Sequence, residues 1–433
     1  MQALLGGIMR LNHHRNFGAA AMAGVLGTSF LLAGVAAAQQ VIAVAQDTMN
    51  EIVVTAQKRT ELLQDVPVAI TVVNATQLAD QHIYSIADLA RTTPSLEMVQ
   101  AFGGPGGGGQ IRGIGTNSFS PTAEGAVGIV VDGVPQGNVN ITNLYDMQRV
   151  EVLKGPQGTL FGLTSSAGVI NIVTAAPDPT KFYVTAHIDY SENGTAGSKF
   201  GESTERAVLN APITSNSAIR LAVSDDRTKG VQINEFNGAD TVSTEWGGRL
   251  RYYLKATDEL TINLSGDYDR RGQNYNDPQF TYVSANPGLT AELAGCGITP
   301  SYANQARCWS QLNDLNYRNY GGSLQVDYNL GAATLTAITG YRAQISAPSD
   351  SDIQGLAAEF AQIFTVGQNL GARQFSQELR IASNGAQKID YVAGLFYSDY
   401  SAQTHYSPGG GFFVGTFDIP PTPFVPPPFP GGW

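Results

Sequence analysis

The residue types that most often perform catalysis or bind metals are few and scattered in this chain. The histidines outside the N-terminal segment, His82, His187 and His405, each stand alone in the sequence. The chain has no Gly-x-Ser-x-Gly elbow, and no pair of carboxylates has a spacing that supports acid and base catalysis. The sequence therefore predicts a protein that is not an enzyme and that holds neither a metal nor a cofactor.

A glycine-rich run, GGPGGGG at residues 103–109, could be mistaken for a phosphate-binding loop. Such a loop ends in Lys-Ser or Lys-Thr, and a dinucleotide fold has a strand before its glycines and a helix after them. Neither context is present here. Two interpretations stay open, a flexible loop that faces a ligand cavity and a plain disordered linker.

Composition restricts the class of protein further. The 433 residues include 25 Lys and Arg against 36 Asp and Glu, a net charge of −11, which argues against a nucleic-acid partner because phosphate recognition needs a basic face. Hydrophobic residues make up 42% of the chain, with 18 Tyr and 18 Phe, which fits poorly with intrinsic disorder.

The first 38 residues have the order of a secretory signal. A basic stretch with Arg10 and Arg15 precedes an apolar stretch at 17–35, and the segment ends in Ala-Ala-Ala at 36–38. We expect a signal peptide at 1–38 that is cleaved after Ala38. A membrane anchor is the alternative, but interrupting glycines and the small-residue ending favour cleavage.

The two cysteines, Cys296 and Cys308, lie within a long polar stretch at 272–316. In an exported protein we expect them to form a disulfide that closes this segment, with a stabilisation on the order of 3 kcal/mol. Metal binding is the lesser alternative, because no further cysteine or histidine lies nearby.

Two patterns of secondary structure follow the signal. Up to about residue 179 the chain is glycine-rich with short apolar strands at 68–73, 127–131, 149–153 and 169–174, which predicts a small mixed α/β domain. Residues 85–91 read as a short helix with Leu89 toward the core. Asp132-Gly133 reads as a two-residue hairpin turn with positive φ at both positions.

Beyond residue 182 apolar and polar residues alternate strictly. Residues 260–269 and 323–330 are the clearest examples, and weaker copies lie at 182–190, 219–223, 246–254, 374–383 and 389–400. This repeat predicts an antiparallel transmembrane β-barrel, since one face of each strand meets lipid and the other a wet lumen. A soluble β-sandwich is the alternative. Short connections (256–258, 331–333) that alternate with long ones (272–316, 347–372) favour the barrel.

Six motifs in the first part of the chain fall in one order. They are EIVVTA at 51–56, VPVAI at 66–70, IRG at 111–113, VDGVP at 131–135, VEVLKGPQG at 150–158 and GVINIV at 168–173. In this order they resemble the N-terminal half of a TonB-dependent outer-membrane receptor. The resemblance implies a plug domain inside a 22-stranded barrel in the Gram-negative outer membrane, which imports a scarce ligand with energy from the inner membrane.

The resemblance divides the chain into a signal at 1–38, a periplasmic leader at 39–59, a plug at 60–178 and barrel strands at 179–417. Within the leader it implies a TonB box made of Glu51, Ile52, Val53, Val54, Thr55 and Ala56. An unpaired apolar strand of this kind invites strand addition by a partner protein, here TonB. The alternative is a leader that merely docks on the plug.

The resemblance also implies ion pairs between plug and barrel. Arg112, Glu151 and Lys154 are charges in otherwise apolar plug strands, and Glu378 is a candidate partner on the barrel. Solvated strand surface is the alternative. A ferric siderophore is the ligand that the resemblance favours. Cobalamin, oligosaccharides and plant-derived organic compounds are alternatives, and Tyr275, Phe280 and Tyr282 are candidate ligand contacts. The remaining partner is outer-membrane lipid.

The chain after residue 179 has about half the length that 22 strands of about ten residues with their connections require. We count nine or ten strands, followed by a proline-rich tail at 418–433 that cannot donate ladder hydrogen bonds. We therefore expect an incomplete barrel, from a fragment, a truncated gene product or half of a split receptor. A passive pore or surface barrel without energy coupling is the functional alternative.

Overall fold

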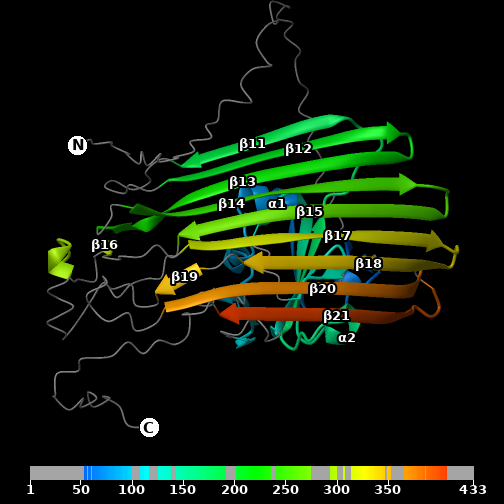
Figure 1. Cartoon of the computed structure of the whole chain (residues 1–433). Coiled ribbons are helices and arrows are strands. Elements are labelled where there is room, and N and C mark those ends of the chain that lie inside the picture. Colours follow the sequence, from blue (N-terminus) through cyan, green and yellow to red (C-terminus); the bar gives the residue numbers. More distant parts are fainter. Residues whose placement is uncertain are drawn as a thin grey trace, which may run out of the picture. The chain divides into compact units, whose positions relative to one another are not determined.

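The computed structural model describes fourteen segments of the chain (Figure 1): residues 53–55, 57–59, 61–99, 108–116, 125–137, 143–191, 201–235, 239–274, 293–299, 306–307, 314–346, 349–352, 365–385 and 387–406. The signal at 1–38, most of the leader at 39–59 and the proline-rich tail at 418–433 lie outside the described residues and stay predictions.

The first part of the described chain is a small α/β domain, which we call the plug. Its main sheet has the order β3-β9-β10-β7-β8, in which β10 and β7 are parallel and the other pairs antiparallel. The strands of this sheet are β3 (Ile70–Asn74), β7 (Val127–Val131), β8 (Val134–Pro135), β9 (Met147–Lys154) and β10 (Gly168–Thr174). A second sheet contains β4 (Leu96–Val99), β5 (Gly108–Ile111) and β6 (Ile114–Gly115), and the helices are α1 (Ala75–Asp80), α2 (Gly158–Phe161) and the 3-10 turns η1 (Leu63–Asp65) and η2 (Ala87–Arg91).

Apolar side chains cover both faces of the main sheet. Ile170 and Ile172 of β10 belong to one buried cluster, whereas Val169 of the same strand belongs to a second cluster on the opposite face. Side chains of successive strand residues point to opposite faces, so a nearly continuous apolar strand is buried on both sides. The second cluster also contains Val54, which comes from the leader.

Local expectations for the plug are largely confirmed. Asp132 and Gly133 have φ of 46° and 82°, as the predicted hairpin turn between β7 and β8 requires. Leu89 is fully buried, although its helix is a 3-10 turn. In the glycine-rich run, Gly108 and Gly109 belong to β5, and residues 103–107 lie outside the described part of the chain.

The second part of the chain is one large antiparallel sheet, which we call the wall. Its order is β11-β12-β13-β14-β15-β17-β18-β20, with β19 and β21 also paired to β20 and the short β16 paired to β13. The bounds are β11 (Tyr183–Ser191), β12 (Glu202–Thr214), β13 (Ser217–Asn234), β14 (Ala239–Lys255), β15 (Leu260–Asn274), β16 (Ala306–Arg307), β17 (Asp314–Asn329), β18 (Ala333–Ser346), β19 (Ser349–Asp352), β20 (Thr365–Ser383) and β21 (Val392–Tyr406).

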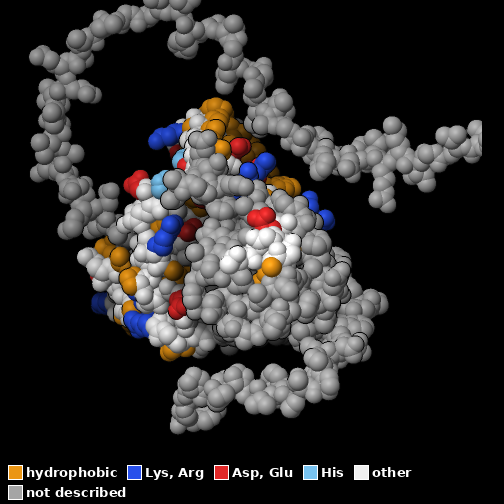
Figure 2. Space-filling model, turned by 90° about the vertical axis from the view of Figure 1, so that its left-hand side faces the viewer, with side chains coloured by type: hydrophobic (Ala, Val, Ile, Leu, Met, Phe, Trp, Pro, Cys, Tyr) orange, Lys and Arg blue, Asp and Glu red, His pale blue; other side chains and the backbone are white. Residues whose placement is uncertain are grey.

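The predicted alternation is present along these strands, with apolar side chains on the face directed away from the plug. Leu264, Leu324 and Leu379 are 51%, 40% and 45% exposed. Figure 2 views the side that is on the left in Figure 1, and hydrophobic side chains gather at its top, where β11 and β12 lie. Such exposure is costly in water and expected in lipid.

Among the described strands, the wall does not close on itself. β11 pairs with β12 and β21 pairs with β20, and neither has a partner on its other edge within the described residues. This agrees with the expected incomplete barrel. Among the helices that the structure describes, none is long and apolar enough to span a membrane.

Plug and wall approach each other closely at a wall glycine. A Cβ atom on Gly340 of β18 would lie 2.6 Å from Cγ1 of Val134 and 2.9 Å from Oγ of Ser376. Gly371 of β20, by contrast, has no heavy atom within 4 Å of such a Cβ. Gly340 therefore provides the space into which the plug packs.

We predict that Gly340→Ala weakens the seating of the plug by about 1–3 kcal/mol, because one extra methyl group overpacks this contact. The urea concentration at which a protease begins to cleave the plug measures the effect. Gly371→Ala is the matched control and should leave that concentration unchanged. Equal behaviour of the two variants would show that the close approach is not needed.

Candidate functional site

The predicted TonB box is docked in this structure. Of its six residues the structure describes Val53, Val54 and Thr55, and Glu51, Ile52 and Ala56 lie outside the described residues. β1 (Val53–Val54) pairs antiparallel with β2 (Glu61–Leu62), and Val54 is fully buried. The segment is therefore one strand of a small hairpin, which we call the leader hairpin (residues 53–62). The described part of the segment is thus paired in this structure, and its role as a TonB box stays a prediction.

A buried carboxylate holds Thr55 on the plug. The backbone N–H of Thr55 donates to Oε1 of Glu151 at 2.9 Å, and its hydroxyl donates to the same oxygen at 3.3 Å. Arg149 donates to this oxygen at 2.7 Å, and Asn171 donates to Oε2 at 2.9 Å. Glu151 is fully buried, so its charge requires these donors.

A second ion pair joins the leader hairpin to the wall. Lys58 Nζ lies 3.0 Å from Oε2 of Glu378, and both side chains are at most 10% exposed. Burial lowers the pKa of Lys58, and the carboxylate of Glu378 opposes that shift. Arg380 donates to the other oxygen of Glu378 at 2.5 Å, and the Lys58 ammonium lies 4.8 Å from the ring centroid of Phe161.

The turn of the leader hairpin has an unusual backbone conformation at Lys58. Its φ is 62°, and its N–H donates to the carbonyl of Thr55 at 2.9 Å. Next to it, Arg59 lies 3.5 Å from Asp390 in the connection between β20 and β21 and also pairs with Glu61. One short segment thus contacts the plug through Thr55 and the wall through Lys58 and Arg59.

Wall arginines bind carboxylates and carbonyls of the plug. Arg220 forms a two-pronged contact with Asp146, at 2.8 and 2.6 Å. Arg251, directly opposite Arg220 in the sheet, donates to the carbonyl of Thr174 at 3.0 Å and lies 3.8 Å from Asp132. This is a positive patch on the wall that receives negative groups of the plug.

The same patch includes Arg249, which is two residues from Arg251 on the same face of β14. Its guanidinium donates to the carbonyl of Tyr145 at 3.3 Å and lies 4.8 Å from the Tyr145 ring centroid. Burial raises the pKa of the Tyr145 hydroxyl well above its ordinary value, so this phenol stays neutral. Arg249 and Tyr145 therefore form a cation–π interaction.

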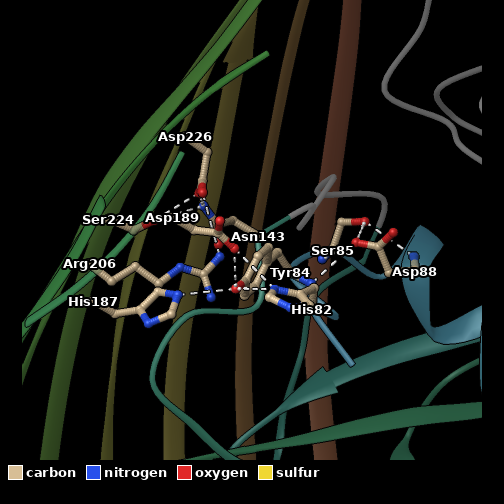
Figure 3. Close-up of polar contacts among 10 residues, drawn as sticks. All are labelled: His82, Tyr84, Ser85, Asp88, Asn143, His187, Asp189, Arg206, Ser224 and Asp226. Carbon is tan, nitrogen blue, oxygen red and sulfur yellow. Dashed lines mark hydrogen bonds and ion pairs between the residues drawn. The ribbon is translucent and has the colours of Figure 1, made fainter. Parts of the chain in front are cut away.

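Figure 3 shows a third group of contacts, centred on Tyr84 of the plug. The Tyr84 hydroxyl lies 3.0 Å from Nδ1 of His82 and 3.2 Å from Nε2 of His187, and it donates to Asp189 at 3.3 Å. The guanidinium of Arg206 lies 4.1 Å from the Tyr84 ring centroid. His82 and His187, solitary in the sequence, thus meet at the contact between the plug and β11.

The predicted ion pairs are only partly as expected. Glu378 does face the plug, but its partners are Lys58 and Arg380, and Glu151 is paired within the plug to Arg149. Neither Arg112 nor Lys154 forms an ion pair with a described residue. The reason is local, since Arg112 is exposed at the tight turn between β5 and β6, with a φ of 56°.

The other predicted residues fall largely outside the described chain. Tyr275, Phe280 and Tyr282 lie outside the described residues, so their contacts stay predictions. Cys296 is disulfide-bonded, and its predicted partner Cys308 lies outside the described residues.

The wall arginines were missed in the sequence although a signal for them exists. Arg249 and Arg251 occupy the face opposite Leu250 within an alternating strand. That face meets the lumen, and a charge there is close to whatever fills the barrel. Lys58 carries no comparable signal, because only the folded leader hairpin brings it to the wall.

A polar cavity of about 540 Å³ lies among the leader hairpin, the plug and the wall. Thr55 and Lys58 line it from the hairpin, Asp132 and Asn171 from the plug, and Gln325 and Thr336 from the wall. The leader hairpin therefore forms one side of a space between plug and wall.

Residues 62–169 match the family described as TonB-dependent Receptor Plug Domain. These residues form a plug domain of this family. It is 38% identical over 137 residues to the pesticin receptor of Yersinia pestis, an alignment that covers 31% of this chain and 20% of the relative. It is 27% identical over 291 residues to the vitamin B12 transporter BtuB of Vibrio vulnificus, covering 64% of this chain and 44% of the relative.

The wall has the same fold as solved receptors. The ferric yersiniabactin uptake receptor FyuA from Yersinia pestis superposes with a TM-score of 0.62 at 22% identity, over 79% of this chain and 50% of that one. The siderophore receptor PiuA from Acinetobacter baumannii gives a TM-score of 0.58 at 15% identity, over 81% and 47%. The chain spans half or less of the length of these relatives.

These matches confirm the family resemblance and the fold class. A plug of this family followed by antiparallel strands of the receptor wall places the chain in the Gram-negative outer membrane. The relatives are receptors and transporters rather than enzymes, in agreement with the expectation for this chain.

We predict that Glu378→Gln loosens the leader hairpin. Without this carboxylate the buried Lys58 faces Arg380 uncompensated, at a cost of about 3–5 kcal/mol. A nitroxide on Val53→Cys, a position that is 41% exposed, would report the change as faster label motion in its electron paramagnetic resonance spectrum.

Asp399→Asn is the control, because this exposed acid on β21 forms no hydrogen bond or ion pair with the described residues of the leader hairpin. Its spectrum should equal that of the parent chain. An unchanged spectrum for Glu378→Gln as well would show that the ion pair does not hold the hairpin.

Proposed function

We propose that the chain belongs to a receptor that imports a small ligand across the outer membrane by energy coupling to TonB, with the leader hairpin as the segment that TonB takes up. The observation that carries the proposal is the position of Thr55 and Lys58. This short segment is tied to the plug by Glu151 and to the wall by Glu378. A pull on it acts on both contacts at once.

The contacts suit release as well as docking. When Thr55 leaves, Glu151 keeps Arg149 and Asn171 as donors, and when Lys58 leaves, Glu378 keeps Arg380. Neither carboxylate is left buried without a cation, which would cost several kcal/mol. The hairpin can therefore undock at a smaller cost than its buried charges suggest.

Undocking also frees the backbone that a partner strand needs. In the docked state Val53 and Val54 pair with Leu62 and Glu61. This ladder has only two residues on each strand. Strand addition by TonB would replace this short ladder with an intermolecular one. Removal of the hairpin would also open one side of the polar cavity between plug and wall.

For the ligand we propose a ferric siderophore. The names of two structural neighbours of this chain support this class, since FyuA is a ferric yersiniabactin uptake receptor and PiuA a siderophore receptor. The vitamin B12 transporter among the relatives makes a cobalamin the second candidate. Tyr275, Phe280 and Tyr282 are the proposed ligand contacts, because aromatic rings can stack on planar ligand groups.

We predict that deletion of residues 51–56 abolishes binding of the purified C-terminal domain of TonB to the detergent-solubilised chain, because the added strand loses its template. Isothermal titration calorimetry measures the loss. Deletion of residues 41–46, also six residues from the leader, is the control and should retain binding.

In cells that carry the complete receptor, the same deletion should abolish uptake of the ferric ligand. Uptake that persists without residues 51–56 would overturn energy coupling and favour the passive pore.

A further inference from the structure

The group of contacts around Tyr84 joins the plug to the first three strands of the wall (Figure 3). Its plug members include His82 and Tyr84, which lie between α1 and β4, and its wall members come from β11, β12 and β13. His82 Nδ1 lies 3.0 Å from Oδ2 of Asp189 and 3.0 Å from the Tyr84 hydroxyl. A histidine of the plug therefore faces a carboxylate of the wall at hydrogen-bonding distance.

The backbone around His82 fixes the position of this residue beside the wall. His82 follows α1 with a φ of 50°, a conformation that helix ends more often give to glycine. Its N–H donates to the carbonyl of Ala79 at 3.2 Å, and its carbonyl accepts a hydrogen bond from Arg91 at 2.9 Å. Both backbone polar groups of His82 are thus bound within the plug, and the imidazole is available to Asp189.

The described charges around this contact sum to a negative value when the histidines are neutral. Four carboxylates and two guanidinium groups interact there: Asp88, Asp189, Glu202, Asp226, Arg91 and Arg206. Each guanidinium pairs with one carboxylate, at 3.0 Å and 3.6 Å. The two remaining carboxylates include Asp189, so a positive charge on His82 would have net negative surroundings among the described residues.

Tyr84 and His187 are the other titratable groups of this contact. Burial and the nearby Asp189 raise the pKa of the Tyr84 hydroxyl, so this phenol keeps its proton and can donate to Asp189. His187 Nε2 lies 3.2 Å from the same hydroxyl, but His187 is also the ladder partner of Arg206. A charge on His187 would oppose that guanidinium. His82 is therefore the histidine whose protonation strengthens the contact.

Protonation of His82 changes the contact in two ways. Neutral imidazole has a single N–H, on either nitrogen, whereas imidazolium has both and always presents one from Nδ1 to Asp189. The hydrogen bond of the imidazolium is also charge-assisted, which makes it stronger. Imidazole groups change charge between about pH 5 and 8, where a carboxylate such as Asp189 stays ionised.

We propose that His82 and Asp189 form a proton-dependent latch, which holds plug residues 82–91 on β11. Near about pH 5.5 the imidazolium pairs with Asp189, and near about pH 8 only the neutral hydrogen bonds remain. The stabilisation is thus present at low pH and is lost as the pH rises, so residues 82–91 detach more often in alkaline medium.

The position of the latch shows which medium it responds to. Asp189 is near the end of β11 that lies on the same side of the sheet as the long connection at 275–313, whereas the short turn at 215–216 is on the opposite side. Long connections of such barrels face the exterior. The latch therefore responds to the pH outside the cell, and the inference depends neither on TonB nor on the identity of the ligand.

The test uses the full chain in nonionic detergent, with a thiol reporter beneath the plug. Thr204 of β12 is the ladder partner of Asp189 and is 1% exposed. In Thr204→Cys the rate of alkylation by a maleimide reports how often the plug detaches there, and the chain without this substitution gives the background. The rate is measured at about pH 5.5 and at about pH 8, with and without His82→Asn. The ratio of the two rates at one pH cancels the ionisation of the thiol, and asparagine tolerates the positive φ of residue 82.

At about pH 5.5 His82→Asn should raise the alkylation rate about two- to fivefold, the range of an exposed ion pair, because the His82 side chain is 62% exposed. At about pH 8 the rates with and without the substitution should be equal. Tyr84→Phe is the control. It removes a hydroxyl and keeps His82 and Asp189, so it should change the rate by the same factor at both pH values.

Asp189→Asn keeps the proposal testable if the His82→Asn chain does not fold. It removes the carboxylate instead of the imidazole and should likewise raise the rate at about pH 5.5 and leave it unchanged at about pH 8. For either variant, a ratio that is the same at both pH values would overturn the proposal, because the residue would then act through packing or not at all.

Discussion

Charges buried between the plug and the wall need partners on the opposite side, and this requirement holds the two parts of the chain together. Asp146 meets Arg220, and Lys58 meets Glu378, in each case with side chains that are at most 10% exposed. An unpaired charge in either place would cost several kcal/mol. The pairs therefore select one position of the plug against the wall, which apolar contact alone would specify less sharply.

The same requirement explains how a docked segment can leave. Besides their contacts with the leader hairpin, Glu151 and Glu378 each have a basic partner, Arg149 and Arg380, which belongs to the same part of the chain as the carboxylate. Departure of the leader hairpin removes one partner and leaves the other. The docking contacts thus fix the position of the leader hairpin, while Arg149 and Arg380 can neutralise the carboxylates after it leaves. Such contacts suit a segment that another protein has to capture.

On its outer face the wall contacts the lipid bilayer instead of the plug. Exposed leucines such as Leu264 and Leu379 meet hydrocarbon, and the exposed rings of Tyr268 and Tyr320 lie on the same face. On both faces of the wall, charged side chains therefore have partners of opposite charge. In the lumen Arg220 is matched by Asp146 of the plug and Arg342 by Asp267 of the wall, and on the outer face Arg227 is matched by Asp225.

The order of residues along the chain was sufficient to predict the features that depend on neighbours. Alternation predicted the wall strands and their two faces, Asp132-Gly133 predicted a turn with positive φ, and the six motifs predicted the plug. Only the tertiary structure decided the ion pairs, because they join distant residues. Lys58 and Glu378 are 320 positions apart, and Lys58 reaches the wall only once the leader hairpin forms. Arg112, which the sequence favoured as an ion-pair residue, is exposed at a tight turn, since charge alone does not specify where a loop will place it.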